Sequence, residues 1–163
     1  IVSKLIKPGS SVLDIGCNCG FIGLHIYHYV SSYDGIEINP YLVKIAKEVQ
    51  EYLNSTNTNF YNIDFINYNS NKKYDFVFSF ASDEVADGLS KLSFEEYIKK
   101  ILFLMEKDGI LFFESQASDI MNNTWERKYN ILKKYFKIIK EKKIFSEYPT
   151  NVKERVYLIL KRK

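Results

Sequence analysis

The sequence predicts an α/β domain of the doubly wound class: a mostly parallel seven-stranded sheet with an antiparallel last strand and helices on both faces. Five short apolar runs rich in β-forming residues alternate with segments whose apolar residues recur at helical spacing. The cores of these strands are apolar, which is typical of parallel strands covered on both faces. Two more strand-like runs follow near the end without a helix between them. We therefore expect a closing hairpin that places one antiparallel strand at the edge of the sheet.

Turn and breaker residues bound the strands. Pro8 and Gly9 precede the first strand, and Gly109 separates a helix from the fifth. The run YDFVFSF is the clearest strand, because nearly every residue in it is a β-former. The expected strands are Ser11–Ile15, Tyr33–Ile38, Asn59–Ile63, Tyr74–Phe80, Ile110–Glu114, Phe136–Phe145 and Arg155–Leu160.

Apolar stripes and capping signals mark the helices. Pro40 suits the first turn of a helix, where its missing N–H would have had no partner. Ser93 followed by Glu96 is a capping box, which predicts that a helix begins there. The expected helices are Phe21–Val30, Pro40–Leu53, Ser93–Glu106 and Trp125–Tyr135.

Length and composition favour one domain. The chain has 163 residues, 46% of them hydrophobic, which is enough for one packed core, so we expect a single domain over residues 1–163. It begins at Ile1 without an initiator Met, which indicates a segment cut from a longer chain. The formal charge is only +3, from 23 Lys and Arg against 20 Asp and Glu. Composition therefore gives no reason of its own to expect nucleic acid or an anionic membrane as a partner.

The cysteines bear on the compartment. Cys17 and Cys19 lie one residue apart, too close to staple a fold, which favours a reducing compartment. No apolar run approaches the roughly 18 residues of a membrane span, and no signal-peptide pattern is present. We therefore expect a cytoplasmic protein with no membrane partner.

The loop after the first strand is the richest in candidate binding residues. Gly16 and Gly20 allow backbone to approach a ligand closely, and Asn18 between them is the non-glycine residue that best tolerates positive φ. The helix that follows offers free N–H groups to a negative group beside it. Asp14, however, would repel phosphates at this place. The loop therefore suits a ligand that carries a positive ammonium.

Two further carboxylates follow strands two and three. Glu37 can accept both hydroxyl protons of a ribose, because a carboxylate offers two oxygens with several lone pairs. Asp64 beside the backbone N–H of Phe65 can accept from the amino group of an adenine while that N–H donates to a ring nitrogen. Together with the first loop, these residues describe a site for a nucleoside that bears a cationic amine.

The order and spacing of these residues resemble the class I S-adenosylmethionine-dependent methyltransferases. The stretch Asp14–Gly20 resembles that family's first motif, an acidic residue followed by alternating glycines, with Asn18 in place of the middle glycine. Tyr74–Ser79 and Leu104–Phe113 resemble the fourth motif and the approach to the fifth strand. Lys107–Gly109 stands where the family often has a Pro-Gly-Gly turn, and we expect a type I turn there.

The resemblance implies that S-adenosylmethionine is the cofactor and that its methyl group passes to an acceptor nucleophile by in-line displacement. Glu37 matches the family's ribose-binding acid, and Asp64 matches the residue that contacts adenine. The cofactor-binding residues implied in this way are Asp14, Gly16, Cys17, Asn18, Gly20, Phe21, Glu37, Ile38, Asp64, Phe65 and Ser79.

Acceptor-side groups follow the fourth strand in this family, and here that segment contains Asp83 and Glu84. They are our candidates for a general base or for binding the hydroxyls of an acceptor. Glu114 ends the fifth strand and should face the same mouth. Asp83, Glu114 and Asp119 have ligand types suited to Mg²⁺, but no spacing is specific for it, so we expect no metal. His25 and His28 lie one turn apart without partners for zinc.

Four interpretations of function remain. The leading one is methyl transfer to a small-molecule acceptor, such as a sugar or a biosynthetic intermediate. The same chemistry on RNA depends only on a late cluster of basic residues. A nicotinamide-dinucleotide-binding domain fits the glycines and Glu37 in part, but Asp14 opposes it. The last is an assembly module without turnover. The basic cluster consists of Arg127, Lys128, Lys133, Lys134, Lys137, Lys140, Lys142 and Lys143.

Overall fold

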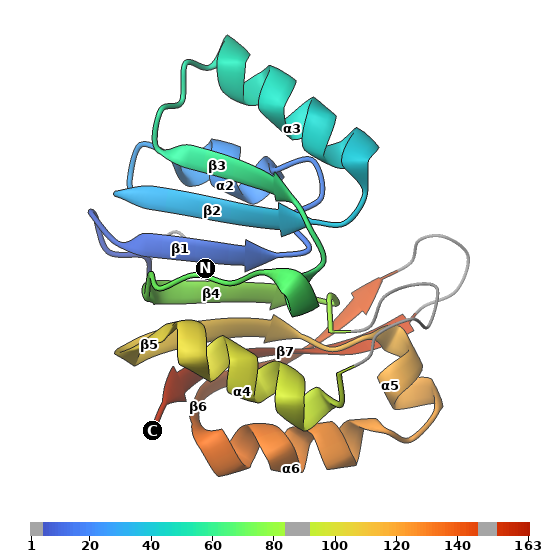
Figure 1. The fold of residues 1–163 in the computed structure, drawn as a ribbon. Helices are drawn as coiled ribbons and strands as arrows, with labels where there is room; N and C mark the ends of the chain where they lie inside the picture. The colour runs from blue at the N-terminus through green and yellow to red at the C-terminus, as the bar shows by residue number, and fades with distance from the viewer. Residues whose placement is uncertain (1–4, 84–91, 147–152) are drawn as a thin grey trace.

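A computed structural model shows a single seven-stranded sheet in the order β3-β2-β1-β4-β5-β7-β6 (Figure 1). The structure describes residues 5–83, 92–146 and 153–163. Strands β1 to β5 are parallel, and β7 runs antiparallel to both β5 and β6. The strands are β1 (Ser11–Ile15), β2 (Ser32–Glu37), β3 (Thr58–Asn62), β4 (Tyr74–Phe80), β5 (Met105–Glu114), β6 (Phe136–Ser146) and β7 (Lys153–Arg162).

Helices cover both faces of this sheet. Figure 1 shows α4 in front of the strands and α2 behind them. Residues of α2 and α3 pack with one apolar cluster and residues of α4 and α6 with another. The described helices are α2 (Phe21–Ile26), α3 (Pro40–Tyr52), the 3₁₀-helix η1 (Phe65–Asn67), α4 (Phe94–Leu104), α5 (Ala117–Met121) and α6 (Trp125–Tyr135).

The two clusters lie on opposite faces because neighbouring strand residues point in opposite directions. On β4, Val77 packs with the α4 and α6 face, whereas Phe76 and Phe78 pack with the α2 and α3 face. All three are at most 4% exposed. The central strands are therefore buried on both sides, as the apolar cores of their sequences predict.

The strand order creates one natural ligand site. From β1 the chain proceeds outward to β2 and β3, then returns to place β4 on the other side of β1. The connections after β1 and β4 consequently leave in opposite directions. In open α/β sheets the crevice at the carboxyl ends of two such strands is where ligands bind.

The predicted fold class is confirmed, including the closing hairpin with an antiparallel last strand. The expected position of that strand at the sheet edge is wrong. β7 lies between β5 and β6, so β6 forms the edge. An inserted β7 pairs on both sides, whereas at the edge it would leave one row of its backbone groups unpaired.

Three other elements differ from the expectation. The turn expected at Lys107–Gly109 is part of β5, which begins at Met105 beside Tyr74 and continues across an irregularity in its pairing with β4. The first helix ends at Ile26, and the carbonyl of Tyr29 beyond it accepts from the Gly9 N–H. Helix α5 is new, because five residues are too few to show a helical period.

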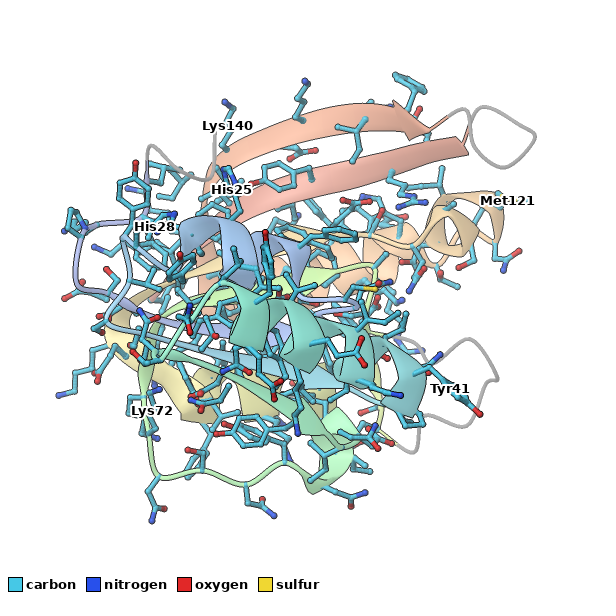
Figure 2. All side chains as sticks on the ribbon, turned by 90° about the horizontal axis from the view of Figure 1, so that it is seen from above. His25, His28, Tyr41, Lys72, Met121 and Lys140 are labelled. Carbon is cyan, nitrogen blue, oxygen red and sulfur yellow. The ribbon has the colours of Figure 1, made fainter. Side chains whose placement is uncertain are left out.

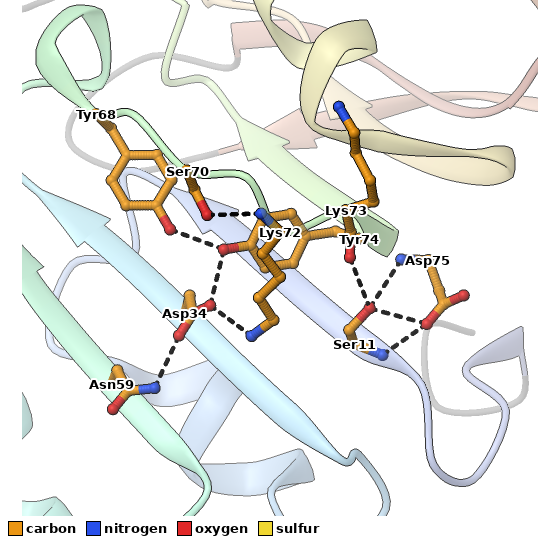
Figure 3. A network of polar contacts seen from close by, with 9 residues as sticks. All are labelled: Ser11, Asp34, Asn59, Tyr68, Ser70, Lys72, Lys73, Tyr74 and Asp75. Atoms are coloured by element: carbon orange, nitrogen blue, oxygen red, sulfur yellow. Dashed lines mark hydrogen bonds and ion pairs between the residues drawn. The ribbon is translucent and has the colours of Figure 1, made fainter.

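A polar network joins the strands on the α4 face (Figure 3). Asp34 of β2 is 3% exposed, and its Oδ2 accepts from Lys72 Nζ at 2.6 Å and from the Tyr74 hydroxyl at 2.7 Å. The Asn59 amide on β3 donates to Oδ1 at 2.8 Å, and the hydroxyls of Tyr68 and Tyr74 share a hydrogen bond of 2.7 Å. Both carboxylate oxygens are therefore satisfied, and the network ties the segment before β4 to the outer strands.

Within the described ranges, no helix is long and apolar enough to cross a membrane.

Candidate functional site

The loop after β1 adopts the left-handed backbone that its sequence predicts. The φ angles of Gly16, Asn18 and Gly20 are 74°, 54° and 76°. The Asn18 side chain supports its own conformation, since its Oδ1 accepts from the Cys19 N–H at 2.7 Å. The N–H groups of Gly16 and Cys17 both donate to the Ile36 carbonyl, at 2.8 and 3.0 Å. The loop is thereby anchored to the end of β2.

Gly16 is needed for space as well as for φ. A Cβ atom at this position would lie 2.7 Å from the Cβ of Ser82, in the segment after β4. Ala81, next to Ser82, has φ of 50°, and its N–H donates to the Glu114 carbonyl at 3.0 Å. The loops after β1 and β4 thus approach each other closely at the strand-order reversal.

Glu37 ends β2 with both carboxylate oxygens in use. Oε2 accepts from the backbone N–H of Asn18 at 3.1 Å, and Oε1 accepts from the N–H of Asn39 at 2.8 Å. Each oxygen retains a lone pair, so the carboxylate can still accept two hydroxyl protons. The Asn18 contact also holds the first loop beside the acid predicted to bind ribose.

Asp64 follows β3 and caps the short helix η1. Its Oδ1 accepts from the Ile66 N–H at 3.0 Å. Phe65 is 7% exposed and packs edge-on against Tyr97 of α4, with ring centroids 5.2 Å apart. These contacts fix the Asp64–Phe65 backbone at the rim of the crevice.

These segments enclose a cavity of about 480 Å³ at the carboxyl ends of β1, β2 and β4. Its wall is mixed, with two carboxylates and a majority of apolar side chains. The described lining residues are Ile15, Gly16, Asn18, Ile36, Glu37, Ile38, Asn39, Leu42, Ile63, Asp64, Phe65, Phe80, Ala81 and Ser82.

The cavity brings together Gly16, Asn18, Glu37, Ile38, Asp64 and Phe65, six of the eleven expected cofactor-binding residues. The other five lie outside its lining. Cys17 is 6% exposed beneath the loop, Gly20 is the N-cap of α2, and Ser79 is fully buried, 2.8 Å from the Tyr97 hydroxyl. Phe21 is 76% exposed and borders a separate hollow between α2 and α3. Asp14 is also buried, and its role toward an ammonium stays a prediction.

Asp14 is 2% exposed, and its Oδ2 accepts from the Tyr33 hydroxyl at 2.5 Å. Burial raises the pKa of Asp14 to about 7. The Tyr33 hydrogen bond opposes that rise in pKa, while the nearby charge of Glu37 adds to it. The carboxyl therefore changes charge close to neutral pH at the end of β1, directly before the loop that carries the glycines.

Asp83, one of the two expected bases, lies in a buried ionic cluster with Lys128 and Asp119. Lys128 Nζ is 2.6 Å from Asp83 Oδ2 and 2.6 Å from Asp119 Oδ1, and all three side chains are at most 9% exposed. Asp119 also accepts from the Gln116 N–H at 3.0 Å, and the Gln116 amide donates to the Ala81 carbonyl. The cluster joins α5 and α6 to the segment after β4. Glu84 lies outside the described residues.

The other acid expected at the mouth, Glu114, forms an ion pair of 2.6 Å with Arg155 of β7. The three acids whose type suits Mg²⁺ are thus paired with two different basic residues, Lys128 and Arg155. In the part of the chain that the structure describes, no group of three His, Cys, Asp or Glu residues could hold a metal ion. Sequence reasoning missed Lys128 and Arg155 as partners, because nothing local distinguishes them from surface bases.

The late basic cluster is divided by the fold. Lys128 is buried, which corrects its placement on a basic surface. Lys134 pairs with Glu95 at 2.8 Å, and Lys143 pairs with Glu154 at 2.8 Å. Figure 2 shows Lys140 on the outer hairpin and both histidines near α2, where both are exposed. The cluster is therefore divided between the interior, surface ion pairs and the outer hairpin.

Comparisons with known proteins agree with this geometry. A family model described as a methyltransferase domain matches residues 6–160. A malonyl-[acyl-carrier protein] O-methyltransferase from Ilyobacter polytropus is 35% identical over 104 residues, which make up 60% of this chain and 38% of that protein. The aligned part thus spans well under half the length of that curated relative.

Two solved structures illustrate the fold. The N-methyltransferase NodS of Bradyrhizobium japonicum, in complex with S-adenosylhomocysteine, superposes with a TM-score of 0.76 at 13% identity, covering 95% of this chain and 79% of its own. An rRNA methylase from Streptococcus thermophilus gives 0.73 at 13% identity, covering 99% and 92%. The family model covers nearly the whole chain, with a matching fold and a cavity at the strand-order reversal. The chain belongs to the class I S-adenosylmethionine-dependent methyltransferase family.

Proposed function

We propose that this chain binds S-adenosylmethionine in the cavity between the β1 and β4 loops and transfers its methyl group to a small-molecule acceptor, a sugar or a biosynthetic intermediate. The observation that carries the proposal is Glu37, held by the N–H groups of Asn18 and Asn39 with its carboxylate on the cavity wall. The relative from Ilyobacter polytropus is by its name an O-methyltransferase, which supports transfer to oxygen.

The cavity residues fit this cofactor in chemistry. Glu37 offers lone pairs to a ribose, and Ile38 and Phe65 supply apolar surface for a base. A side chain at Gly16 would collide with Ser82, so the backbone of the β1 loop lies close to the segment after β4 on the cavity wall. The wall carries carboxylates and no Lys or Arg among its described residues, which suits a cationic sulfonium better than a diphosphate.

When bound, S-adenosylmethionine supplies a methyl group on an already activated leaving group. The residues of this chain then have to align donor and acceptor and to exclude water, which supplies much of the rate of such a displacement. A general base is required only for a hydroxyl or a protonated amine. Asp83 as that base stays a prediction. Its ion pair with Lys128 favours a role in holding the segment after β4.

Calorimetric titration with S-adenosylmethionine, S-adenosylhomocysteine and NAD tests the cofactor. We expect micromolar binding of the first two by the wild type and weakening by about 10- to 100-fold in Glu37→Gln, since a hydrogen bond to a charged group contributes about 1.5–3 kcal/mol. The matched control is Glu48→Gln, whose carboxylate is exposed on α3. Binding of NAD alone would overturn the proposal.

A panel of acceptors then tests the substrate class. Wild-type protein with S-adenosylmethionine is incubated with sugars, carboxylic acids or RNA, and S-adenosylhomocysteine formation is measured. Turnover with a small molecule supports the proposal, and turnover confined to RNA contradicts it.

A further inference from the structure

A row of side chains beside the cofactor cavity is not used by any role described above. Phe80 of β4 lies opposite Glu114 of β5, which lies opposite Tyr157 of β7. Because residues in register point to the same face, the three side chains form one line across the carboxyl end of the sheet. Arg155, two residues before Tyr157, belongs to that face as well. Phe80 also lines the cavity, so the row begins at the cofactor site.

Hydrogen-bond donors in this row are shielded from water and unused. Neither the Tyr157 hydroxyl nor Arg155 Nε has a hydrogen-bond partner among the described residues, although each atom is buried. A buried donor without a partner costs about 1–3 kcal/mol of stability. Two such donors that are neighbours on one face of β7 therefore require an explanation. Burial and the nearby charge of Glu114 raise the pKa of Tyr157 to about 12, so the hydroxyl stays a donor at neutral pH.

The charge of the row is balanced before any ligand arrives. Arg155 Nη1 is 2.6 Å from Glu114 Oε1, and the two side chains are 30% and 17% exposed. The pair therefore has no net charge to attract an anion. It instead offers donors from Arg155 and Tyr157 and acceptor lone pairs from Glu114, which is the pattern that matches hydroxyl groups, because a hydroxyl both donates and accepts.

The aromatic rings of the row add an apolar platform. The rings of Phe80 and Tyr157 are stacked at 22° with centroids 6.2 Å apart, and Phe80 stacks on Phe78 at 5.6 Å. Phe80 and Tyr157 are only partly buried, so the exposed part of each ring offers apolar surface to the C–H groups of a ligand that also carries hydroxyls.

We infer that Glu114, Arg155 and Tyr157 form the acceptor-recognition subsite of this enzyme and that the acceptor is a neutral polyhydroxylated molecule of the sugar or cyclitol class. The inference rests on the proposed function, because it places the acceptor beside the donor cavity through Phe80. The inference excludes a carboxylate as the acceptor group, because binding a carboxylate would need a positive charge in the subsite that no neighbouring acid neutralises.

Saturation-transfer NMR with defined probes tests the subsite. The protein is saturated with S-adenosylhomocysteine and mixed with methyl β-D-glucopyranoside, myo-inositol or sodium malonate in turn. We expect transfer to one or both polyols and none to malonate. Tyr157→Phe removes only the hydroxyl and should weaken polyol binding by about tenfold, the effect of one lost hydrogen bond. Arg155→Lys, which keeps the charge and loses Nε, should act in the same direction.

Folding is checked separately for each variant. Since the Tyr157 hydroxyl has no partner within the described structure, Tyr157→Phe should leave the free energy of unfolding unchanged or raise it. The control is Tyr52→Phe, because Tyr52 is 84% exposed on α3. This variant should change neither polyol binding nor the free energy of unfolding. Binding of malonate instead of the polyols overturns the inference, as does polyol binding that Tyr157→Phe leaves intact. If S-adenosylhomocysteine does not bind at all, the proposed function itself fails.

Discussion

Asp14 lies in an environment far from that of a solvated carboxylate. It is buried beneath the loop it helps to define, with Tyr33 as its hydrogen-bond donor, and its pKa is about 7. A carboxyl whose pKa is raised on folding binds its proton more tightly in the folded than in the unfolded state. It therefore stabilises the fold below the unfolded pKa near 4, and that contribution is lost as pH rises towards 7.

We expect this loss to be visible in Asp14→Asn, which keeps an oxygen for the Tyr33 hydroxyl but cannot ionise. Between about pH 4 and 7, the free energy of unfolding of the wild type should fall relative to that of the variant by up to about 1.4 kcal/mol per pH unit. Above pH 7 the two curves of free energy against pH should be parallel. Urea unfolding at a series of pH values measures it. Parallel curves throughout would show that Asp14 titrates normally.

A comparison of Ala variants at Gly16 and Gly9 distinguishes the cost of backbone strain from the cost of a steric clash. Both have positive φ, 74° and 81°, but a Cβ at Gly16 meets Ser82 at 2.7 Å, while one at Gly9 meets nothing within 4 Å. Each Ala variant should lose about 1 kcal/mol of stability from the left-handed conformation. Only Gly16→Ala should also weaken S-adenosylhomocysteine binding, by at least about tenfold, because Ser82 must move on the cavity wall. Calorimetry of the two variants makes the comparison, and equal affinities would contradict it.

Among the elements, α5 and α6 are joined to the β4 loop by the Lys128 cluster. Lys128→Met leaves Asp83 and Asp119 buried on the same side of the sheet without the ammonium between them. Removing one member of a buried ionic cluster typically costs about 3–5 kcal/mol, so the variant should be severely destabilised. Lys134→Met is the control, because its pair with Glu95 is on the surface, where solvent screens the attraction and the pair contributes little. Chemical denaturation compares them, and similar midpoints would show that the cluster is not structural.

The same cluster shows what could be predicted from the sequence and what could not. The capping box is local, and the structure forms both of its hydrogen bonds between Ser93 and Glu96. The left-handed Asn18 and the N-cap position before Pro40 are equally local. Lys128 lies 45 residues from Asp83 in the chain, so its role depends on a tertiary contact that no period or motif encodes. Within the basic cluster it was indistinguishable from a surface lysine.

At the scale of the whole molecule, the sheet itself separates charges that are close in sequence. On β6, Lys137, Lys140 and Lys142 lie opposite Lys161, Ile159 and Tyr157 on β7 and therefore point to the α2 and α3 face. Lys143 lies opposite Val156 and points to the other face, where α6 also packs. A net charge of +3 is thus spread over two faces instead of forming one basic surface.

This arrangement predicts weak and non-specific binding to RNA. Affinity for a nucleic-acid backbone grows with the number of phosphates neutralised together. Four lysines lie on this face, but Lys161 pairs with Asp108 at 3.0 Å, so about three phosphates can be neutralised. We expect a dissociation constant weaker than about 10⁻⁵ M for a single-stranded oligoribonucleotide at physiological salt, with a slope of log K against log salt no steeper than about −2. Filter binding across a salt series measures both quantities. Lys137→Ser with Lys140→Ser and Lys142→Ser should abolish this binding while leaving S-adenosylhomocysteine affinity unchanged, because the three residues lie outside the described cavity lining. Submicromolar binding with a steep salt dependence would contradict this prediction. It would favour RNA over a polyol as the acceptor and count against the polyol subsite.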